Sequence, residues 1–268
     1  MTPLKICLPA VPKRNFICEG GAMAHYNCIM IDLDNTLLDF DKAENQALEK
    51  TFAQFEFPDT PENRAVYKQL NSQLWQELEK GKIKRDALAV VRWKKFLAHL
   101  GRLGNAGKIN EFYMNCLSQG CSPLPGALEF LEAVEDYATI AIITNGSEKV
   151  QKNRLAYSGV AAFVDGIFIS ERMGIHKPDK RFVNLALERL GVTNRQKVLV
   201  IGDSLTADIK CGVDAGLATC WCNFKGQENT LNLQPTYTVQ GFEELKRVIL
   251  TQEELENDGT EKAHKIKA

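Results

Sequence analysis

The sequence reads CIMIDLDNT from Cys28 to Thr36, and this stretch decides the fold. Its first four residues form a continuous apolar run, which is typical of a short strand buried on both faces. Two aspartates, Asp32 and Asp34, follow that run directly. Ligands of open α/β sheets bind beyond the carboxyl ends of the strands. The stretch therefore predicts a buried strand with a polar site at its carboxyl end.

Downstream of residue 123, short apolar runs alternate with amphipathic segments of helical length. Buried strands that alternate with helices form a parallel sheet covered on both faces. We therefore expect an α/β fold. Its further strands are expected at residues 139–143, 166–169, 197–201, 218–222 and 237–239, separated by helices at 127–134, 148–157, 180–190 and 205–215 and followed by a final helix.

Between about residues 42 and 120 the periodicity is helical throughout. Three helices of this region are expected near residues 43–55, 88–100 and 109–117, in addition to one near residues 66–78. Because no segment here has the pattern of a strand, we expect a helical bundle inserted after the first strand. Its two connections to the rest of the chain suit hinged opening and closing. One buried helical stripe is predicted by apolar residues spaced four apart, which are Val66, Leu70, Leu74 and Leu78.

The bundle also carries aromatic and basic side chains that could meet a ligand. Aromatic residues at helical spacing are more often part of a bundle core than a platform for stacking a base. We expect most of them to lie in the core. Lys82, Lys84 and Arg85 are expected to form a solvated charge cluster. The aromatic residues concerned are Tyr67, Trp75, Trp93, Phe96 and Tyr113.

The composition argues against several classes of protein. The 268 residues are 44% hydrophobic and 25% charged, with a formal net charge of −1. That balance predicts no general attraction to a nucleic acid polymer or to an anionic membrane. No apolar run reaches the roughly 20 residues that span a bilayer. The eight cysteines lack the paired spacing of a zinc site, which favours buried thiols in a reducing cytoplasm.

The two ends of the chain differ in character from the rest. Residues 1–27 contain prolines and glycines without a clear period, and we expect a disordered extension rather than a signal peptide. Met23 is an alternative start of the native protein. Residues 253–268 are highly charged and are expected to form a frayed tail.

Four strand ends carry polar residues of particular kinds. The first strand ends in Asp32-Leu33-Asp34, and the second in Thr144-Asn145-Gly146-Ser147. Lys177 follows the third strand, and Asp203 and Asp208 follow the fourth. Each motif alone is common as a turn or as a helix cap. Together, at the carboxyl ends of one parallel sheet, they indicate a shared site.

The residue types at this edge suit phosphoryl transfer. Clustered carboxylates need a cation, and Mg²⁺ prefers oxygen ligands. A carboxylate can attack phosphorus to form an aspartyl-phosphate once the metal and Lys177 screen the charge of the phosphate. Thr144 and the backbone N–H groups after it can donate to phosphoryl oxygens. Asp34, two residues after Asp32, projects from the same side of an extended backbone and can transfer protons.

The four motifs resemble those of the haloacid dehalogenase (HAD) superfamily, most of whose members are phosphatases. The resemblance covers nearly all of residues 28–250. It implies a Rossmann-like parallel sheet, the HAD core, in residues 28–41 and 122–252. It also implies a helical-bundle cap of the first type (C1) in residues 42–121, and a mobile flap at residues 37–41.

The resemblance also implies a role for each acid of the motifs. Asp32 is expected to be the nucleophile and Asp34 the general acid and base. The Mg²⁺ ion is expected to bind Asp32, the backbone carbonyl of Asp34, and Asp203. Asp208 is expected to support the water shell of the metal or to orient Lys177.

The phosphate group is expected to be held at the second and third motifs. Thr144 and Lys177 would hold the phosphoryl group during the reaction. His176, although it is adjacent to Lys177, is expected to be structural. The residues expected to bind phosphate are Leu33, Asn145, Gly146 and Lys177.

The details of the motifs favour one branch of the superfamily. The dehalogenase branch of the superfamily uses no metal and lacks the second acid of the first motif. Because Asp34 is present here, together with the Gly202-Asp203-Ser204 motif of the metal-dependent members, dehalogenation is disfavoured. Residues 32–40, 143–146, 171–179 and 202–209 look most similar to bacterial pyrimidine 5′-nucleotidases, which hydrolyse nucleoside monophosphates. The leading hypothesis is therefore a cytoplasmic nucleotidase, monomeric or a small homo-oligomer, that acts on a small phosphorylated metabolite. A sugar-phosphate phosphatase or phosphomutase, and a vestigial phosphate-binding module, remain open as alternatives.

Overall fold

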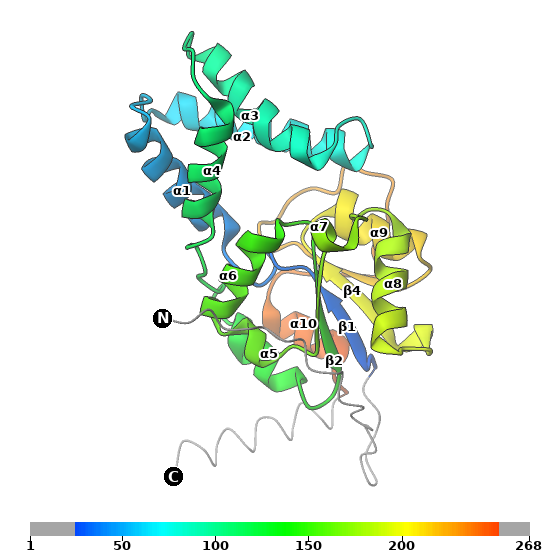
Figure 1. The fold of residues 1–268 in the computed structure, drawn as a ribbon. Helices are drawn as coiled ribbons and strands as arrows, with labels where there is room; N and C mark the ends of the chain where they lie inside the picture. Colours follow the sequence, from blue (N-terminus) through cyan, green and yellow to red (C-terminus); the bar gives the residue numbers. More distant parts are fainter. Residues whose placement is uncertain (1–24, 252–268) are drawn as a thin grey trace, which may run out of the picture. The chain divides into compact units, whose positions relative to one another are not determined.

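The computed structural model describes residues 25–251. Among these residues, six parallel strands form a sheet in the order β3-β2-β1-β4-β5-β6 (Figure 1). β1 lies inside the sheet, between β2 and β4, and the strand order changes direction there, which opens a crevice at the carboxyl ends. The strands are β1 (Cys28–Ile31), β2 (Thr139–Thr144), β3 (Gly166–Ile169), β4 (Val198–Gly202), β5 (Ala218–Cys222) and β6 (Tyr237–Val239).

Helices cover both faces of the sheet, because its strands are apolar on both sides. Ile29 and Ile31 of β1 pack with residues of α5 and α10 on one face, and Met30 packs with residues of α8 and α9 on the other. Figure 1 shows these two helix pairs on opposite sides of the strands. The α-helices that follow residue 123 in the chain are α5 (Ala127–Val134), α6 (Glu148–Ser158), α7 (Ser170–Met173), α8 (Lys180–Leu190), α9 (Lys210–Asp214) and α10 (Phe242–Ile249).

The predicted α/β fold with a parallel sheet is confirmed, and two of its helices differ from expectation. The segment predicted as one helix over residues 205–215 is a π-helical turn, Leu205–Ile209, followed by α9. The N–H groups of Asp208 and Ile209 both donate to the carbonyl of Ser204, at 3.0 and 3.1 Å. An apolar period cannot distinguish this wider turn from an α-helix. The four-residue α7 is too short to show a period at all.

The chain divides into two compact units. One, the sheet unit, comprises, within the described part of the chain, residues 25–38, Pro123–Glu148 and residues 155–251. The other, the helical unit, comprises Asp39–Ser122 and Lys149–Arg154. Its main helices are α1 (Phe40–Gln54), α2 (Pro61–Glu79), α3 (Arg85–His99) and α4 (Ala106–Leu117).

Local signals in the sequence set the starts of these helices. The Asp39 carboxylate accepts from the Lys42 N–H at 2.8 Å at the start of α1, and the Thr60 hydroxyl accepts from the Asn63 N–H at the start of α2. Pro61 takes the first position of α2, where its missing N–H costs nothing. The helix α2 therefore begins five residues before the apolar stripe that first predicts it at Val66.

The helical unit has an aromatic core, as expected. Tyr67, Trp93, Phe96 and Tyr113 are fully buried and pack ring against ring, with the centroids of Tyr67 and Trp93 4.9 Å apart. Trp75 differs, because it is half-buried and lies beneath the guanidinium of Arg85. The prediction that most of these aromatic residues form the core is therefore confirmed.

A polar chain of side chains crosses this aromatic core. Arg92, which is 4% exposed, donates to the side-chain oxygens of Asn71 and Asn110, each at 2.9 Å. Asn71 donates in turn to the carboxylate of Glu44 at 2.9 Å. The Arg92 guanidinium also lies 4.9 Å from the ring centroid of Tyr113. These hydrogen bonds link one side chain from each of α1, α2, α3 and α4 within the core of the helical unit.

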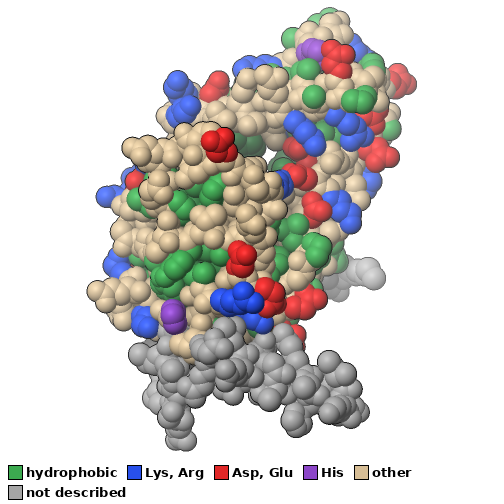
Figure 2. Space-filling view, turned by 180° about the vertical axis from the view of Figure 1, so that it is seen from behind, with side chains coloured by type: hydrophobic (Ala, Val, Ile, Leu, Met, Phe, Trp, Pro, Cys, Tyr) green, Lys and Arg blue, Asp and Glu red, His purple; other side chains and the backbone are tan. Residues whose placement is uncertain are grey.

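The surface offers no single basic patch on the face drawn in Figure 2, where Lys and Arg side chains are scattered among Asp and Glu. Within residues 25–251, no helix has both the length and the apolar character needed to cross a bilayer. The predictions about residues 1–24, including the alternative start at Met23, and about the tail at 253–268 concern residues outside the described part of the chain.

Candidate active site

The predicted site residues of the sheet unit all lie at the carboxyl edge of its strands. Asp32 follows β1, Thr144 ends β2, and Asp203 follows β4. Because Ile31 is in register with both Ile142 of β2 and Ile201 of β4, the polar residues after these strands reach the same level. The parallel register therefore brings together residues that are more than a hundred positions apart.

Lys177 is the centre of the site. Its Nζ lies 2.6 Å from Asp32 Oδ1, 2.6 Å from Asp208 Oδ1 and 2.7 Å from the carbonyl oxygen of Ile143. The ammonium group donates hydrogen bonds to Asp32 Oδ1 and to the Ile143 carbonyl, and it forms an ion pair with Asp208 Oδ1. Lys177 is 1% exposed, Asp208 1% and Asp32 6%. The site is therefore a buried ion triad, which is stable only while all its members are present.

The charged groups of this triad shift one another's pKa values. Burial alone would lower the pKa of Lys177, but the carboxylates of Asp208 and Asp32 outweigh that effect and raise it, which keeps the ammonium protonated. Burial raises the pKa of Asp32 above its ordinary range, and the charges of Asp208 and Asp34 add to the rise, while Lys177 opposes it. The acids of the site thus outnumber its one lysine, and their mutual repulsion opposes their ionising together.

The backbone around Lys177 is held by Asn145, which directly follows β2. The Lys177 N–H donates to Asn145 Oδ1, and Asn145 Nδ2 donates to the Lys177 carbonyl, both at 2.9 Å. This reciprocal pair fixes the loop that carries the lysine. Thr144 is 1% exposed, and its hydroxyl accepts from the Gly146 N–H at 3.1 Å. Of these two residues, Asn145 is the one whose side chain holds the backbone of Lys177 in position.

Gly202, the last residue of β4, makes room for Asp208. A Cβ atom at Gly202 would lie 2.3 Å from the carboxyl carbon of Asp208, far inside any normal contact. Asp208 Oδ2 accepts from the Ser204 N–H at 3.1 Å, so its carboxylate is tied to the same turn. The Ser204 hydroxyl in turn accepts from the Ala207 N–H at 3.1 Å. The glycine is needed because Asp208 must approach the strand closely to reach Lys177.

Three acids form a group that could hold a cation. The carboxylates of Asp32, Asp203 and Asp208 each offer an oxygen, and these atoms all lie within 4.8 Å of one another. Burial raises the pKa of Asp203 well above its ordinary value, and the charges of Asp32 and Asp208 raise it further. The backbone of Asp203 is held by Trp221, whose Nε1 donates to its carbonyl at 2.8 Å. Two buried acids and one half-buried acid, which outnumber the one lysine of the triad and offer only oxygen ligands, fit a hard divalent cation such as Mg²⁺.

Asp34 lies in a tight turn just after β1. The N–H groups of Leu37 and Leu38 both donate to the carbonyl of Leu33, at 3.0 and 2.8 Å. The Leu33 side chain is buried in the core of the sheet unit, between the two acids. Asp34 is half-buried and near enough to Asp32 for its charge to raise the pKa of that carboxyl. The turn therefore keeps the two acids as neighbours, as the sequence predicts.

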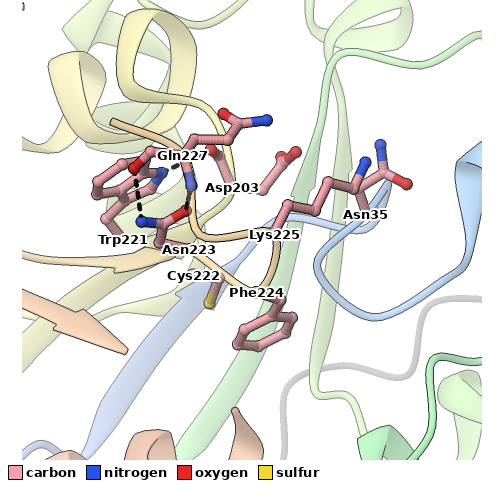
Figure 3. Close-up of a pocket in the computed structure, with 8 residues that line it drawn as sticks. All are labelled: Asn35, Asp203, Trp221, Cys222, Asn223, Phe224, Lys225 and Gln227. Carbon is pink, nitrogen blue, oxygen red and sulfur yellow. Dashed lines mark hydrogen bonds between the residues drawn. The ribbon is translucent and has the colours of Figure 1, made fainter. Parts of the chain in front are cut away.

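A pocket beside Asp203 contains residues that the sequence does not point to. It has an empty volume of about 250 Å³, including its open mouth, and Asn35 and Lys225 line it from two different loops. Figure 3 shows the Lys225 side chain extending toward Asn35, with Asp203 beside them. No periodicity or motif singles out Lys225, since it lies in a turn three residues after β5. Lys225 could therefore not be identified from the sequence.

The sequence is similar to a known protein family over most of its length. Residues 29–222 match the family model of haloacid dehalogenase-like hydrolases. The pyrimidine 5′-nucleotidase YjjG of Escherichia coli K12 is 35% identical over 224 residues, which cover 84% of this chain and 98% of that protein. The pyrimidine 5′-nucleotidase PynA of Streptococcus pneumoniae is 36% identical over 222 residues, covering 82% and 93%.

The fold is also similar to that of a solved crystal structure. The magnesium-bound crystal structure of the HAD-hydrolase YfnB from Bacillus subtilis has a TM-score of 0.80 and 36% sequence identity, covering 84% of this chain and 98% of that one. The chain therefore belongs to the haloacid dehalogenase-like hydrolase family. The predicted family, fold and enzyme class are confirmed. The roles of the individual site residues and the boundaries of the predicted cap stay predictions.

Proposed function

We propose that this protein is a Mg²⁺-dependent phosphomonoester hydrolase that acts through an aspartyl-phosphate and prefers nucleoside 5′-monophosphates, particularly pyrimidine ones. The observation that carries the proposal is the buried contact of 2.6 Å between Asp32 and Lys177, within a group of three acids. The relatives named pyrimidine 5′-nucleotidases support the choice of substrate. A cytoplasmic location and a monomeric or small homo-oligomeric state remain predictions.

The metal would be held by Asp32, the backbone carbonyl of Asp34, and Asp203, with Asp208 behind them. When bound, Mg²⁺ supplies positive charge that screens the phosphate and stabilises the charge that develops on its oxygens. The excess of buried carboxylates over Lys177 supports this assignment, because such a group is costly without a cation.

Asp32 would carry out the first step. Lys177 holds Asp32 at Oδ1, so Oδ2 is the oxygen left to attack phosphorus. A bond forms between Oδ2 and phosphorus while the bond from phosphorus to the ester oxygen breaks. Asp34 donates its proton to that leaving oxygen, which departs as a free hydroxyl. Thr144, at the adjoining end of β2, would donate to a phosphoryl oxygen.

Asp34 would then act as the base of the second step. It takes a proton from a water molecule, whose oxygen attacks the phosphorus of the aspartyl-phosphate. The bond between phosphorus and Asp32 breaks, and inorganic phosphate and the Asp32 carboxylate are released. Lys177 stays protonated and keeps Asp32 oriented through both steps.

The test is a steady-state assay of the full chain with uridine and deoxyuridine 5′-monophosphates. Mg²⁺-dependent release of phosphate is expected, and it should stop on full chelation. Asp32→Asn should lower the rate by about three orders of magnitude or more, because it removes the nucleophile. Asp136→Asn, an exposed acid just before β2, is the matched control and should keep the wild-type rate. Normal turnover by Asp32→Asn would contradict the proposal.

The alternatives give different results in the same experiment. A sugar-phosphate phosphatase would turn over hexose phosphates with a higher kcat/KM than the nucleotides, and a phosphomutase would move the phosphate instead of releasing it. A vestigial binding module would show no turnover with any member of a broad panel of phosphate esters.

A further inference from the structure

The pocket beside Asp203 has polar side chains that the proposed reaction does not use. Asn35 follows Asp34, the proposed acid that protonates the leaving oxygen, and Lys225 lies on the loop after β5. Asp203 lines the same pocket. Whatever enters the pocket therefore lies next to Asp203, a proposed metal ligand, and next to the residue that follows the proposed acid in the chain.

The loop that carries Lys225 is closed by its own hydrogen bonds. Asn223 Nδ2 donates to the Gln227 carbonyl at 2.9 Å, and the Gln227 N–H donates to Asn223 Oδ1 at 2.7 Å. The Asn223 N–H donates to the carbonyl of Val239 in β6 at 2.8 Å, which ties the loop to the sheet. A side chain at the tip of such a loop is presented with less loss of backbone entropy on binding.

Asn35 is fixed in a comparable way. Its N–H donates to the Leu38 carbonyl at 2.8 Å, and its φ of 58° lies in the left-handed region that asparagine tolerates. This conformation directs the amide into the pocket with Lys225 (Figure 3). An ammonium group only donates hydrogen bonds, whereas an amide donates and accepts. The pair is therefore suited to a hydroxyl or carbonyl oxygen.

The charge of Lys225 is near the acids but separate from the triad. Its ammonium acts in the direction that lowers the pKa of Asp203, although burial and the neighbouring acids raise that pKa overall. Lys177, by contrast, is held within the triad by Asp32, Asp208 and the carbonyl of Ile143, and it does not line the pocket. Lys225 does line it, so its side chain lies where a second part of the substrate would enter.

We propose that Lys225 and Asn35 form a subsite for the leaving group, which binds oxygen atoms of the nucleoside released from the phosphate. This inference rests on the proposed nucleotidase function and adds two specificity-determining residues to it. The subsite would favour esters whose leaving group bears hydroxyl or carbonyl oxygens close to the phosphoester. Aryl phosphates lack such oxygens and would gain little from it.

The experiment compares two substrates and two products. For Lys225→Met, kcat/KM with uridine 5′-monophosphate should fall roughly tenfold more than kcat/KM with p-nitrophenyl phosphate, mainly through KM. Inhibition by uridine should weaken by a similar factor, while inhibition by inorganic phosphate should change much less. Lys225→Arg should restore most of the preference for the nucleotide, since it keeps a charged donor.

Two further variants separate the side chains from the fold. Asn35→Gly removes the amide but tolerates the positive φ, and it should shift the substrate ratio in the same direction. Lys197→Met lies just before β4, at the opposite end of that strand from the site, and should leave the ratio and both inhibition constants unchanged. Thermal melting checks that each variant is folded.

The outcomes are distinct. Equal losses for both substrates, together with weaker inhibition by phosphate, would mean that Lys225 contacts the phosphoryl group, and would overturn the subsite. An unchanged substrate ratio in Lys225→Met would overturn it too, while leaving the nucleotidase proposal intact. A wild-type protein that hydrolyses p-nitrophenyl phosphate but no nucleotide would overturn both.

Discussion

Lys177 is the residue on which the site depends most. It is the positive member of a buried triad, so its removal leaves two carboxylates without their partner in a poorly solvated place. The same contact sets which oxygen of Asp32 is available. A single side chain thus links the stability of the sheet unit to the chemistry proposed for it.

Replacing Lys177 with Met should therefore have two effects. We expect a loss of about 3–5 kcal/mol in unfolding free energy, as for other buried pairs broken on one side, and a loss of turnover. Urea unfolding and a phosphatase assay measure the two. In the double variant with Asp32→Asn, part of the lost stability should return, because one unpaired charge is gone. A double variant less stable than Lys177→Met alone would contradict the triad.

Gly202 offers a second test at the scale of one residue. Gly202→Ala should displace Asp208, costing about 1–3 kcal/mol by overpacking, and should lower turnover because Lys177 loses its alignment. Gly241→Ala is the control, since a Cβ there meets nothing within 4 Å and its φ of −172° is extended. Equal behaviour of the two variants would show that Asp208 does not need the space.

The scale of the element is best seen in the polar chain of the helical unit. Glu44 of α1 faces Asn71, Lys68 and Arg92, with Asp41 on its own helix. Burial raises its pKa, and Arg92 and Lys68 offset this only in part. The folded protein thus holds a proton on Glu44 more tightly than the unfolded chain does, so ionised Glu44 costs stability above the folded pKa.

Glu44→Gln should therefore be more stable than the wild type at pH 8, because the amide oxygen can still accept from Asn71 without carrying a charge. The difference should shrink as the pH falls through the folded pKa, and vanish below the unfolded value near 4.5, where both states are protonated. Thermal melting at several pH values measures it. A variant that is less stable at pH 8 would show that the pairing with Arg92 outweighs burial.

At the scale of the whole molecule, a metal that binds the folded state must stabilise it. With Mg²⁺ at about 100 times its dissociation constant, the expected gain is about 2.7 kcal/mol, or several degrees in melting temperature. The shift should disappear in EDTA and in Asp203→Asn. A melting temperature that is independent of Mg²⁺ in the wild type would contradict the metal site without any reference to activity.

The division into two units raises the question of movement between them. The main chain enters the helical unit at Asp39 and leaves it at Ser122, and it enters the unit a second time for Lys149–Arg154 within α6. The chain therefore passes between the units four times rather than twice, and the hinged movement that the sequence predicts from two connections stays a prediction. Cross-linking the two units covalently should abolish turnover while leaving the melting curve of each unit intact, and unaffected turnover would remove the prediction.

The local pattern of the sequence determines a large part of this protein. Apolar runs such as residues 28–31 and 198–201 determine buried strands, and the helices between them determine a parallel sheet, because short-range periodicity decides which faces are buried. Acids that directly follow such strands are thereby assigned to one edge. Asp32, Asp34 and Asp203 could be identified in this way, together with Lys177.

Only the tertiary structure decides which of these groups touch. The contacts of Lys177 with Asp32 and Asp208, and the pocket shared by Asn35 and Lys225, depend on where loops that are distant in the chain meet. No spacing along the chain encodes them, because they follow from the order and register of the strands. The local sequence identifies the groups at the edge of the sheet, whereas the packing of the strands and loops determines which of these groups are in contact.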